Sequence, residues 1–287
     1  MGITLVSDRM SVILEPAFGA RITALTDQRT GRQWLVDGLC MGGASDEATY
    51  LEAEARGWDE CFPTVAPCFH PGWGQLRDHG VLWGRPWKVT SDPSAERCTT
   101  VYADQRFMFE RCLLLEGAVL TAHYAVTSYG EVRTPYMWSQ HALLATTPQD
   151  RLMLDGIVSM VSGVTHFAWP NHPARQLSGI GAANEGFALK SYATTPWGAS
   201  AAVIGPQGGI SFSWSSQVPA FGLWLDYGGW PEEAPIHQIA LEPTTATADH
   251  LVAAETKGQA RWLGPNDTHQ WTVRVTLTGP EDQGKEP

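Results

Sequence analysis

Apolar and polar residues alternate in short runs along most of the chain, and this pattern predicts β-strands. The clearest pair is 106–115 and 118–127. Alternate positions hold Phe107, Phe109, Leu113 and Leu115 in the first run, and Leu120, Ala122, Tyr124 and Val126 in the second. Glu116 and Gly117 lie between the two runs and supply a turn. Two alternating runs joined by a short glycine-containing turn are typical of a β-hairpin.

Similar runs occur over the rest of the chain, separated by turns rich in glycine and proline. Further strands are expected at 20–26, 33–36, 152–160, 187–192, 200–204, 209–214, 221–226, 236–242 and 271–277. Helical patterns are limited to 46–56 and 248–255, both too short to organise a fold. Because strand follows strand without an intervening helix, we expect an all-β protein, a large antiparallel β-sandwich with few short helices.

Length and composition agree with one large sandwich. The chain has 287 residues, of which 43% are apolar and 17% charged, with 29 glycines and 19 prolines. This composition is typical of a globular, turn-rich protein, and all-β sandwiches of this size commonly form one domain. We therefore expect a single domain over 1–279, followed by a flexible C-terminal tail at 280–287.

Charge and cysteine content narrow the choice of partner and compartment. The net charge of −11 argues against nucleic acid or an anionic membrane as partner, because both require a basic surface. Five cysteines form no CxxC pair, and residues 1–9 lack the basic and apolar parts of a signal peptide. These features favour a cytoplasmic protein that binds a small molecule, as a monomer or a homodimer.

The chain contains 13 tryptophans, and most of them are expected to pack in the core. Several nevertheless stand beside glycine or proline in expected loops: Trp58, Trp73, Trp83, Trp87, Trp169, Trp197 and Trp230. Aromatic faces around a cleft suit the C–H faces of sugars, while the indole N–H can bond a hydroxyl.

Two ionisable residues stand in apolar surroundings and can supply acid–base chemistry. Glu242 follows Ile239-Ala240-Leu241 and precedes a proline, and His141 lies between aromatic and apolar residues. Taken alone, a glutamate after a strand is commonly a solvated charge, and a histidine in an apolar strand is commonly a hydrogen-bonded core residue. Together, a carboxylate and an imidazole facing one pocket can remove one proton and donate another.

Six segments, in this order along the chain, resemble the aldose 1-epimerase (galactose mutarotase-like) family. They are GARITAL at 19–25, GWDECFPT at 57–64, DHGVLW at 78–83, WSQH at 138–141, GLWLDYGGWP at 222–231 and LEP at 241–243. The resemblance runs from about residue 19 to residue 277, and the ordered set carries it rather than any single motif. It implies a β-supersandwich with a cleft across one sheet, and interconversion of the α and β anomers of an aldose without a cofactor.

The resemblance also implies roles for particular residues. Glu242 matches the family's catalytic base, His141 its general acid, and His79 a histidine that positions the sugar. The other candidates for substrate binding are Asp59, Glu60, Asp226, Arg77 and Trp83. The arginine motif and separate aspartate of the best-known branch of the family have no clear match here, which leaves the identity of the sugar open.

The expected reaction accounts for a glutamate and a histidine. Opening a cyclic hemiacetal removes the proton of the anomeric hydroxyl and adds one to the ring oxygen. The aldehyde then turns about its C–C bond and recloses on its other face. A carboxylate and a protonated imidazole can make both transfers together and exchange roles for reclosure.

Three alternatives compete with this interpretation. A metal site is disfavoured because His70 and His79, His166 and His172, and Cys61 and Cys68 have spacings unlike zinc motifs. A hexose-6-phosphate 1-epimerase of the same fold typically carries an arginine soon after its His-Gly. Here Arg85 comes late, although Arg77 and Arg85 could reach an anion.

The third alternative is a non-catalytic carbohydrate-binding or sugar-sensing sandwich. The presence of both Glu242 and His141 favours catalysis, because binding alone needs no matched acid and base.

Overall fold

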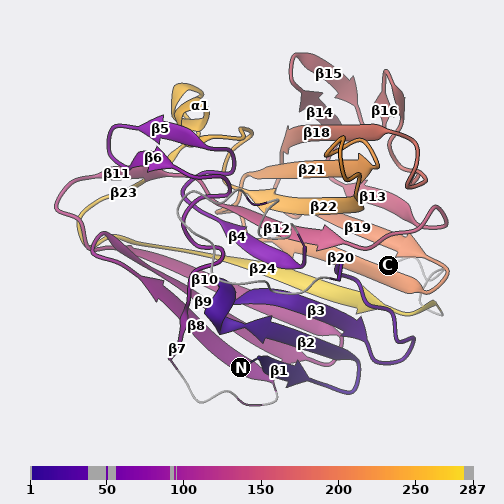
Figure 1. The fold of residues 1–287 in the computed structure, drawn as a ribbon, viewed down its shortest axis with the longest axis horizontal. Helices are drawn as coiled ribbons and strands as arrows, with labels where there is room; N and C mark the ends of the chain where they lie inside the picture. The colour runs from indigo at the N-terminus through magenta and orange to yellow at the C-terminus, as the bar shows by residue number, and fades with distance from the viewer. Residues whose placement is uncertain (1, 38–49, 51–55, 91–93, 95, 281–287) are drawn as a thin grey trace.

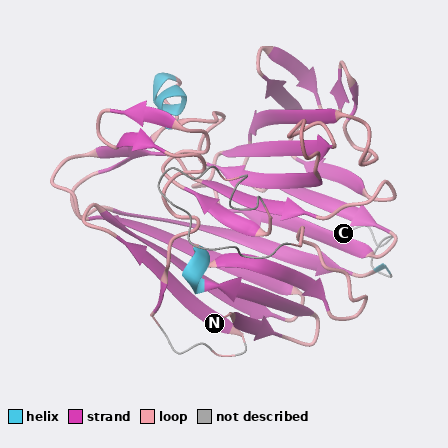
Figure 2. Cartoon of the chain, in the orientation of Figure 1, coloured by secondary structure: helices cyan, strands magenta, loops and turns pink. Residues whose placement is uncertain are grey.

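The computed structural model describes residues 2–37, 50, 56–90, 94 and 96–280. Two large antiparallel sheets form its two layers (Figures 1 and 2). In spatial order, the ten-stranded sheet consists of β1 (Ile3–Val6), β2 (Met10–Glu15), β3 (Arg21–Asp27), β4 (Trp58–Cys61), β12 (Ser139–Leu144), β22 (His237–Thr244), β21 (Ala220–Tyr227), β18 (Phe187–Thr194), β14 (Ser159–Ser162) and β15 (Thr165–Ala168).

The second sheet has eight strands. Their order is β13 (Arg151–Asp155), β19 (Ser200–Gly205), β20 (Gly208–Trp214), β24 (Thr268–Thr278), β10 (Val119–Ser128), β9 (Phe107–Glu116), β8 (Arg97–Ala103) and β7 (Lys88–Val89). Three strand pairs stand apart: β5 (Cys68–His70) with β6 (Gly74–Leu76), β11 (Thr134–Tyr136) with β23 (Arg261–Leu263), and β16 (Asn171–His172) with β17 (Arg175–Gln176). The all-β sandwich expected from the sequence is confirmed.

The helices are short, as expected. A 3-10 turn spans Pro16–Phe18, and α1 spans Leu251–Thr256, where the ring of His250 caps the first turn by accepting from Ala253 N. The helix expected at 46–56 lies largely outside the described residues. In the described part of the chain, no helix is long and apolar enough to cross a membrane.

Most strand predictions are confirmed, and the hairpin is formed by β9 and β10 with Glu116 paired to Val119. Two predictions are wrong. Residues 152–160 do not form one strand, because the chain passes from β13 in one sheet to β14 in the other, and Gly156 at the break has a φ of 71°. Residues 33–36 make only isolated bridges, from Gln33 to Thr26 and from Leu35 to Leu144.

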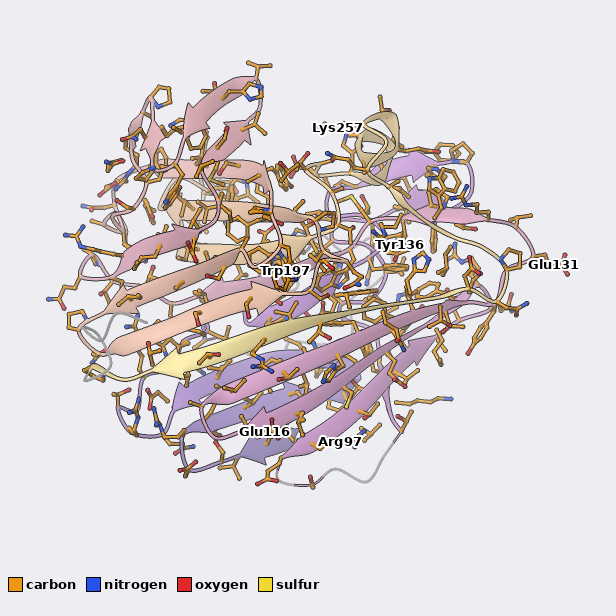
Figure 3. All side chains as sticks on the ribbon, turned by 180° about the vertical axis from the view of Figure 1, so that it is seen from behind. Arg97, Glu116, Glu131, Tyr136, Trp197 and Lys257 are labelled. Carbon is orange, nitrogen blue, oxygen red and sulfur yellow. The ribbon has the colours of Figure 1, made fainter. Side chains whose placement is uncertain are left out.

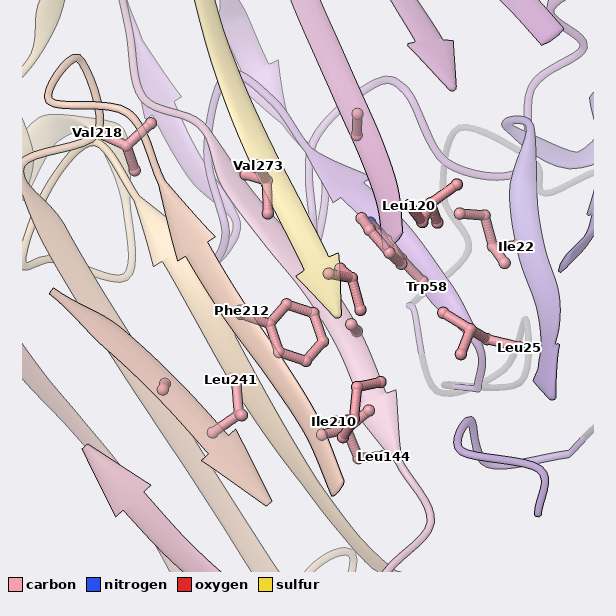
Figure 4. Packing of buried hydrophobic residues seen from close by; sticks show 14 of the residues in the cluster. Ile22, Leu25, Trp58, Leu120, Leu144, Ile210, Phe212, Val218, Leu241 and Val273 are labelled. Atoms are coloured by element: carbon pink, nitrogen blue, oxygen red, sulfur yellow. The ribbon is translucent and has the colours of Figure 1, made fainter. Parts of the chain in front are cut away.

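The core lies between the two layers (Figure 4). Trp58 on β4 meets Phe212 on β20 with ring centroids 6.2 Å apart. The even-numbered side chains of β4 therefore face the opposite sheet. Leu241 on β22 belongs to the same buried cluster. Because successive side chains on a strand point to opposite faces, Asp59 and Glu242 must face away from this core.

One charged pair is buried between the layers. Arg111 occupies a core position in the alternating pattern of β9, and it bonds Glu60 through Nη1 at 2.9 Å. Both side chains are fully buried. Glu60 thus lies on the core face of β4, contrary to its expected place in a sugar-binding cleft. Its negative charge instead compensates the arginine of β9.

Candidate active site

Ionisable side chains from several strands form one row across the outer face of the ten-stranded sheet. Asp59 pairs with His141, and Gly222 pairs with both Glu242 and Tyr192. The register of β12 against β22 places His141 beside Glu242. Residues in register across a sheet point to the same face, so the row is set by strand pairing rather than by closeness in sequence.

His141 and Glu242 come together in this row. The distance from His141 Nε2 to Glu242 Oε1 is 3.9 Å, and the Glu242 side chain is fully buried. Among the described residues, Glu242 Oε1 accepts no hydrogen bond. A separation of this size leaves the two groups adjacent without a hydrogen bond between them, and in active sites such bonds commonly tighten only when substrate arrives.

A lysine that sequence analysis did not identify completes this group. The ammonium of Lys190, on β18, contacts Glu242 Oε2. Lys190 lies 52 residues from Glu242 in the sequence, and the apolar segment around it gives no sign of a functional role. The glycine at 222 leaves space for the pair, since a Cβ there would stand 2.9 Å from Glu242 Oε2.

His79 reaches the site from a tight turn. Its φ of 57° lies in the left-handed region, and Asp78 Oδ1 bonds its Nδ1 at 2.8 Å. The ring stacks on Tyr50 at 4.0 Å and meets the edge of His141 at 4.7 Å. The carboxylate of Asp78 thereby fixes the orientation of the ring beside His141.

Asp59 lies beneath the surface of the pocket. It is fully buried and accepts hydrogen bonds from Arg21 Nε and from the Tyr50 hydroxyl, both at 2.8 Å. The Tyr50 ring in turn lines the pocket. Asp59 therefore faces the predicted side of the sheet but contacts a wall residue rather than the open space.

Arg77 and Trp83 brace the turn that carries His79. Arg77 Nε donates to the carbonyl of Gly80 at 2.8 Å, and its guanidinium lies 4.2 Å from the centre of the Trp83 ring. Trp83 is fully buried and donates through its indole N–H to the carbonyl of Asp78 at 2.7 Å. Neither residue lines the pocket. The expected stacking of a sugar on Trp83 is therefore wrong.

Asp226 also supports a wall residue. Its Oδ1 accepts the backbone N–H groups of Gly229 at 3.0 Å and Trp230 at 3.1 Å, which fixes the turn after β21. Trp230 is partly exposed and meets Trp224 edge to face at 6.0 Å. These two tryptophans, rather than Trp83, provide the large aromatic surfaces of the pocket.

The pocket has a volume of about 390 Å³. Its polar lining consists of Asp78, His79, His141, Lys190, Gln238 and Asp249. Its apolar lining consists of Tyr50, Val65, Ala66, Trp224 and Trp230. A few convergent polar groups within aromatic walls are the usual composition of a small-molecule site.

The charge state of His141 differs from the expectation. Burial lowers the pKa of His141 well below 6.5, and nearby positive charges add to the effect. Those charges are at His79, Lys190 and Arg21. The lowered pKa favours a neutral His141 ring near pH 7, rather than the protonated imidazole expected from the sequence.

The donor side chains do not form a recognisable metal centre. Across the described ranges, no group of three or more His, Cys, Asp or Glu residues is arranged to hold a metal ion. Glu242 is approached by the imidazole of His141 and the ammonium of Lys190, and an ammonium competes with a metal cation for the carboxylate.

The sequence matches no protein-family model, and no curated protein matches it significantly. Solved structures, however, resemble the fold along nearly the whole chain. A proposed aldose 1-epimerase from Escherichia coli K12 has a TM-score of 0.75 at 14% identity, covering 97% of this chain and 99% of that one. A galactose mutarotase related enzyme from Lactobacillus acidophilus has a TM-score of 0.73 at 14% identity, covering 98% of each chain.

A galactose mutarotase-like protein from Clostridium acetobutylicum is similar to the same extent. Its TM-score is 0.72 at 12% identity, covering 97% of this chain and 95% of that one. The fold is therefore the galactose mutarotase-like β-sandwich. At such identities the likeness concerns the fold, and the chemistry must be argued from the residues of the pocket.

Proposed function

We propose that the protein is an aldose 1-epimerase that interconverts the α and β anomers of a neutral aldose. The observation that carries this proposal is the pairing of Glu242 Oε1 with His141 Nε2 at 3.9 Å. His141 lines a pocket of about 390 Å³ with aromatic walls, and the fully buried Glu242 lies next to His141 and Lys190, which both line it. A sugar ring packed on Trp224 or Trp230 would present its hydroxyls to the polar side chains.

In the proposed reaction, Glu242 Oε1 takes the proton of the anomeric hydroxyl while protonated His141 gives its Nε2 proton to the ring oxygen. The bond between the anomeric carbon and the ring oxygen breaks, and the anomeric carbon becomes an aldehyde. After rotation about the adjacent C–C bond, neutral His141 takes the proton of the attacking hydroxyl and Glu242 returns its proton to the aldehyde oxygen. All protons and bonding electrons are restored at the end of the cycle.

Anomer exchange measured by NMR on a panel of sugars tests the proposal. We expect faster exchange of glucose or galactose with enzyme than without, and a higher kcat/KM for the neutral sugar than for glucose 6-phosphate at matched ionic strength. The reason is that the pocket-lining lysine already contacts Glu242, while Asp78 and Asp249 add negative charge.

Two other results would change the assignment. A clear preference for the phosphate would favour the hexose-6-phosphate branch of the fold. Saturable sugar binding without any acceleration of exchange would favour the non-catalytic sandwich, in which Glu242 and His141 only bind hydroxyls.

The proposed mechanism has a distinctive pH dependence. The pKa of His141 is held well below 6.5, so its protonated fraction is small at neutral pH. That fraction grows about tenfold for each unit by which pH falls toward this pKa, and kcat/KM should rise accordingly. The measurement is kcat/KM between about pH 8 and pH 6, after subtraction of uncatalysed exchange. A flat profile over this range would mean that neutral His141 is the reactive form.

A further inference from the structure

Among the described residues, Lys190 is the one cationic side chain that lies closer to Glu242 than His141, whose Nε2 is 3.9 Å from Oε1. The Glu242 side chain is fully buried, whereas the Lys190 side chain retains 20% of its exposure and lines the pocket. A buried carboxylate without a paired charge is costly and tends to take up a proton. The ammonium of Lys190 thus supplies the paired charge that this buried carboxylate needs.

The contact also makes the two oxygens of Glu242 different. Oε2 is occupied by the ammonium of Lys190, whereas Oε1 accepts no hydrogen bond within the described parts of the chain and faces His141. Rotation of the carboxylate would break the ion pair. The free oxygen is therefore held on the side where the acid stands.

Strand register shows how the lysine reaches this position. Lys190 on β18 pairs with Trp224 on β21. Trp224 lies two residues along β21 from Gly222, which pairs with Glu242. Its side chain reaches diagonally across β21, and a Cβ at Gly222 would stand 2.9 Å from Glu242 Oε2. The absence of a side chain at 222 is what allows lysine and glutamate to meet.

We propose that Lys190 is the positioning residue of this site, holding Glu242 Oε2 so that an ionised Oε1 faces His141 and the substrate. The inference rests on the proposed epimerase function and extends it to a residue that acts through the base. The inference also explains why the pocket contains a lysine although the proposed substrate is neutral. The charge of Lys190 pairs with the Glu242 carboxylate rather than with the substrate.

The test compares Lys190→Met with Lys190→Arg. Loss of the contact should lower kcat by about 10²-fold with a much smaller change in KM, because a misplaced base impairs the chemical step more than binding. Arginine preserves the charge and the carboxylate contact and should recover activity to within about tenfold of wild type. Circular dichroism and unfolding curves establish that both variants fold.

Lys257→Met is the matched control. Lys257 and Lys190 line an adjoining cavity of about 280 Å³, but the ammonium of Lys257 contacts the carbonyl of Thr247 rather than Glu242. This variant also removes one positive charge, and it should leave kcat unchanged. Wild-type kcat in folded Lys190→Met would overturn the proposal, as would an arginine variant as inactive as the methionine one.

NMR titration of His141 provides a readout that does not depend on activity. The titratable and charged groups around His141 are His79 on the turn, Tyr50, Arg21 on β3, Lys190 on β18, Glu242 on β22 and Asp59 on the neighbouring strand. Removal of the lysine charge should raise the pKa of His141 in Lys190→Met, whereas Lys190→Arg should keep it low.

The two experiments separate the two hypotheses. If wild-type protein fails to accelerate anomer exchange, the proposed function fails while the titration still measures the coupling of lysine, glutamate and histidine. If exchange is catalysed but Lys190→Met changes neither kcat nor the pKa of His141, only the role of Lys190 fails.

Discussion

Replacement of Glu242 by glutamine should lower kcat/KM for anomer exchange by about 10²–10⁴-fold, and replacement of His141 by asparagine should do the same. Each change removes a proton-transfer group and retains nearly the same shape. Glutamine cannot accept the proton of the anomeric hydroxyl, and asparagine cannot deliver one to the ring oxygen. The measurement is exchange NMR on purified, folded variants with the best sugar of the panel.

Matched controls lie outside the pocket. Glu255→Gln removes a carboxylate from α1 that bonds His70 at 3.1 Å, and His166→Asn changes an exposed histidine on β15. Both should retain wild-type kcat/KM. If either pocket variant remained within about tenfold of wild type, the corresponding role in proton transfer would be wrong.

The fold could be predicted from the sequence because several long strands, among them β2, β9, β19 and β24, have buried residues at alternate positions. In β9, Phe107, Phe109, Leu113 and Leu115 are buried at alternate positions, so period and register follow from the residues themselves. The pattern fails where a chain segment changes layers. Residues 152–160 are apolar enough to be predicted as one strand, but Gly156 allows the chain to leave one sheet and enter the other.

His141 and Glu242, the proposed acid and base, could be singled out because each stands in an apolar segment and carries chemistry that the other completes. The rest of the site could not, because it depends on which strands become neighbours. Lys190 acquires a role only when β21 places a glycine between it and Glu242. A single sequence contains no local signal for such a diagonal contact across three strands.

Asp59 and Glu60 illustrate a related limit. All four residues of β4 are buried, so this strand shows no alternation that would distinguish its two faces. The distinguishing residue is Arg111, a charged side chain at a core position of β9 that requires an acidic partner. An arginine at a core position predicts a buried acidic partner. That this partner is Glu60 rather than another acid follows only from the stacking of the two sheets.

Arg111→Met should reduce the free energy of unfolding by about 3–5 kcal/mol, because it leaves the buried carboxylate of Glu60 without its cation. Oε1 of Glu60 accepts from Arg111 Nη1 at 2.9 Å, from the Tyr124 hydroxyl at 2.9 Å and from Trp58 Nε1 at 3.1 Å. Oε2 accepts from Trp138 Nε1 at 2.9 Å. All four partners donate, which is the arrangement that an ionised carboxylate requires. Urea unfolding measures the loss.

The control is Glu116→Gln, at the exposed end of the same β9 strand (Figure 3), which should change stability by less than about 0.5 kcal/mol. Glu60→Leu combined with Arg111→Met removes both charges and should be more stable than Arg111→Met alone, since the apolar pair leaves no buried ion. A cost below about 1 kcal/mol for the single variant would mean that Glu60 becomes protonated or hydrated at little expense. The Arg111–Glu60 pair would then contribute little to the stability of the packing between the two sheets. Glu60 would again be a candidate for a functional role.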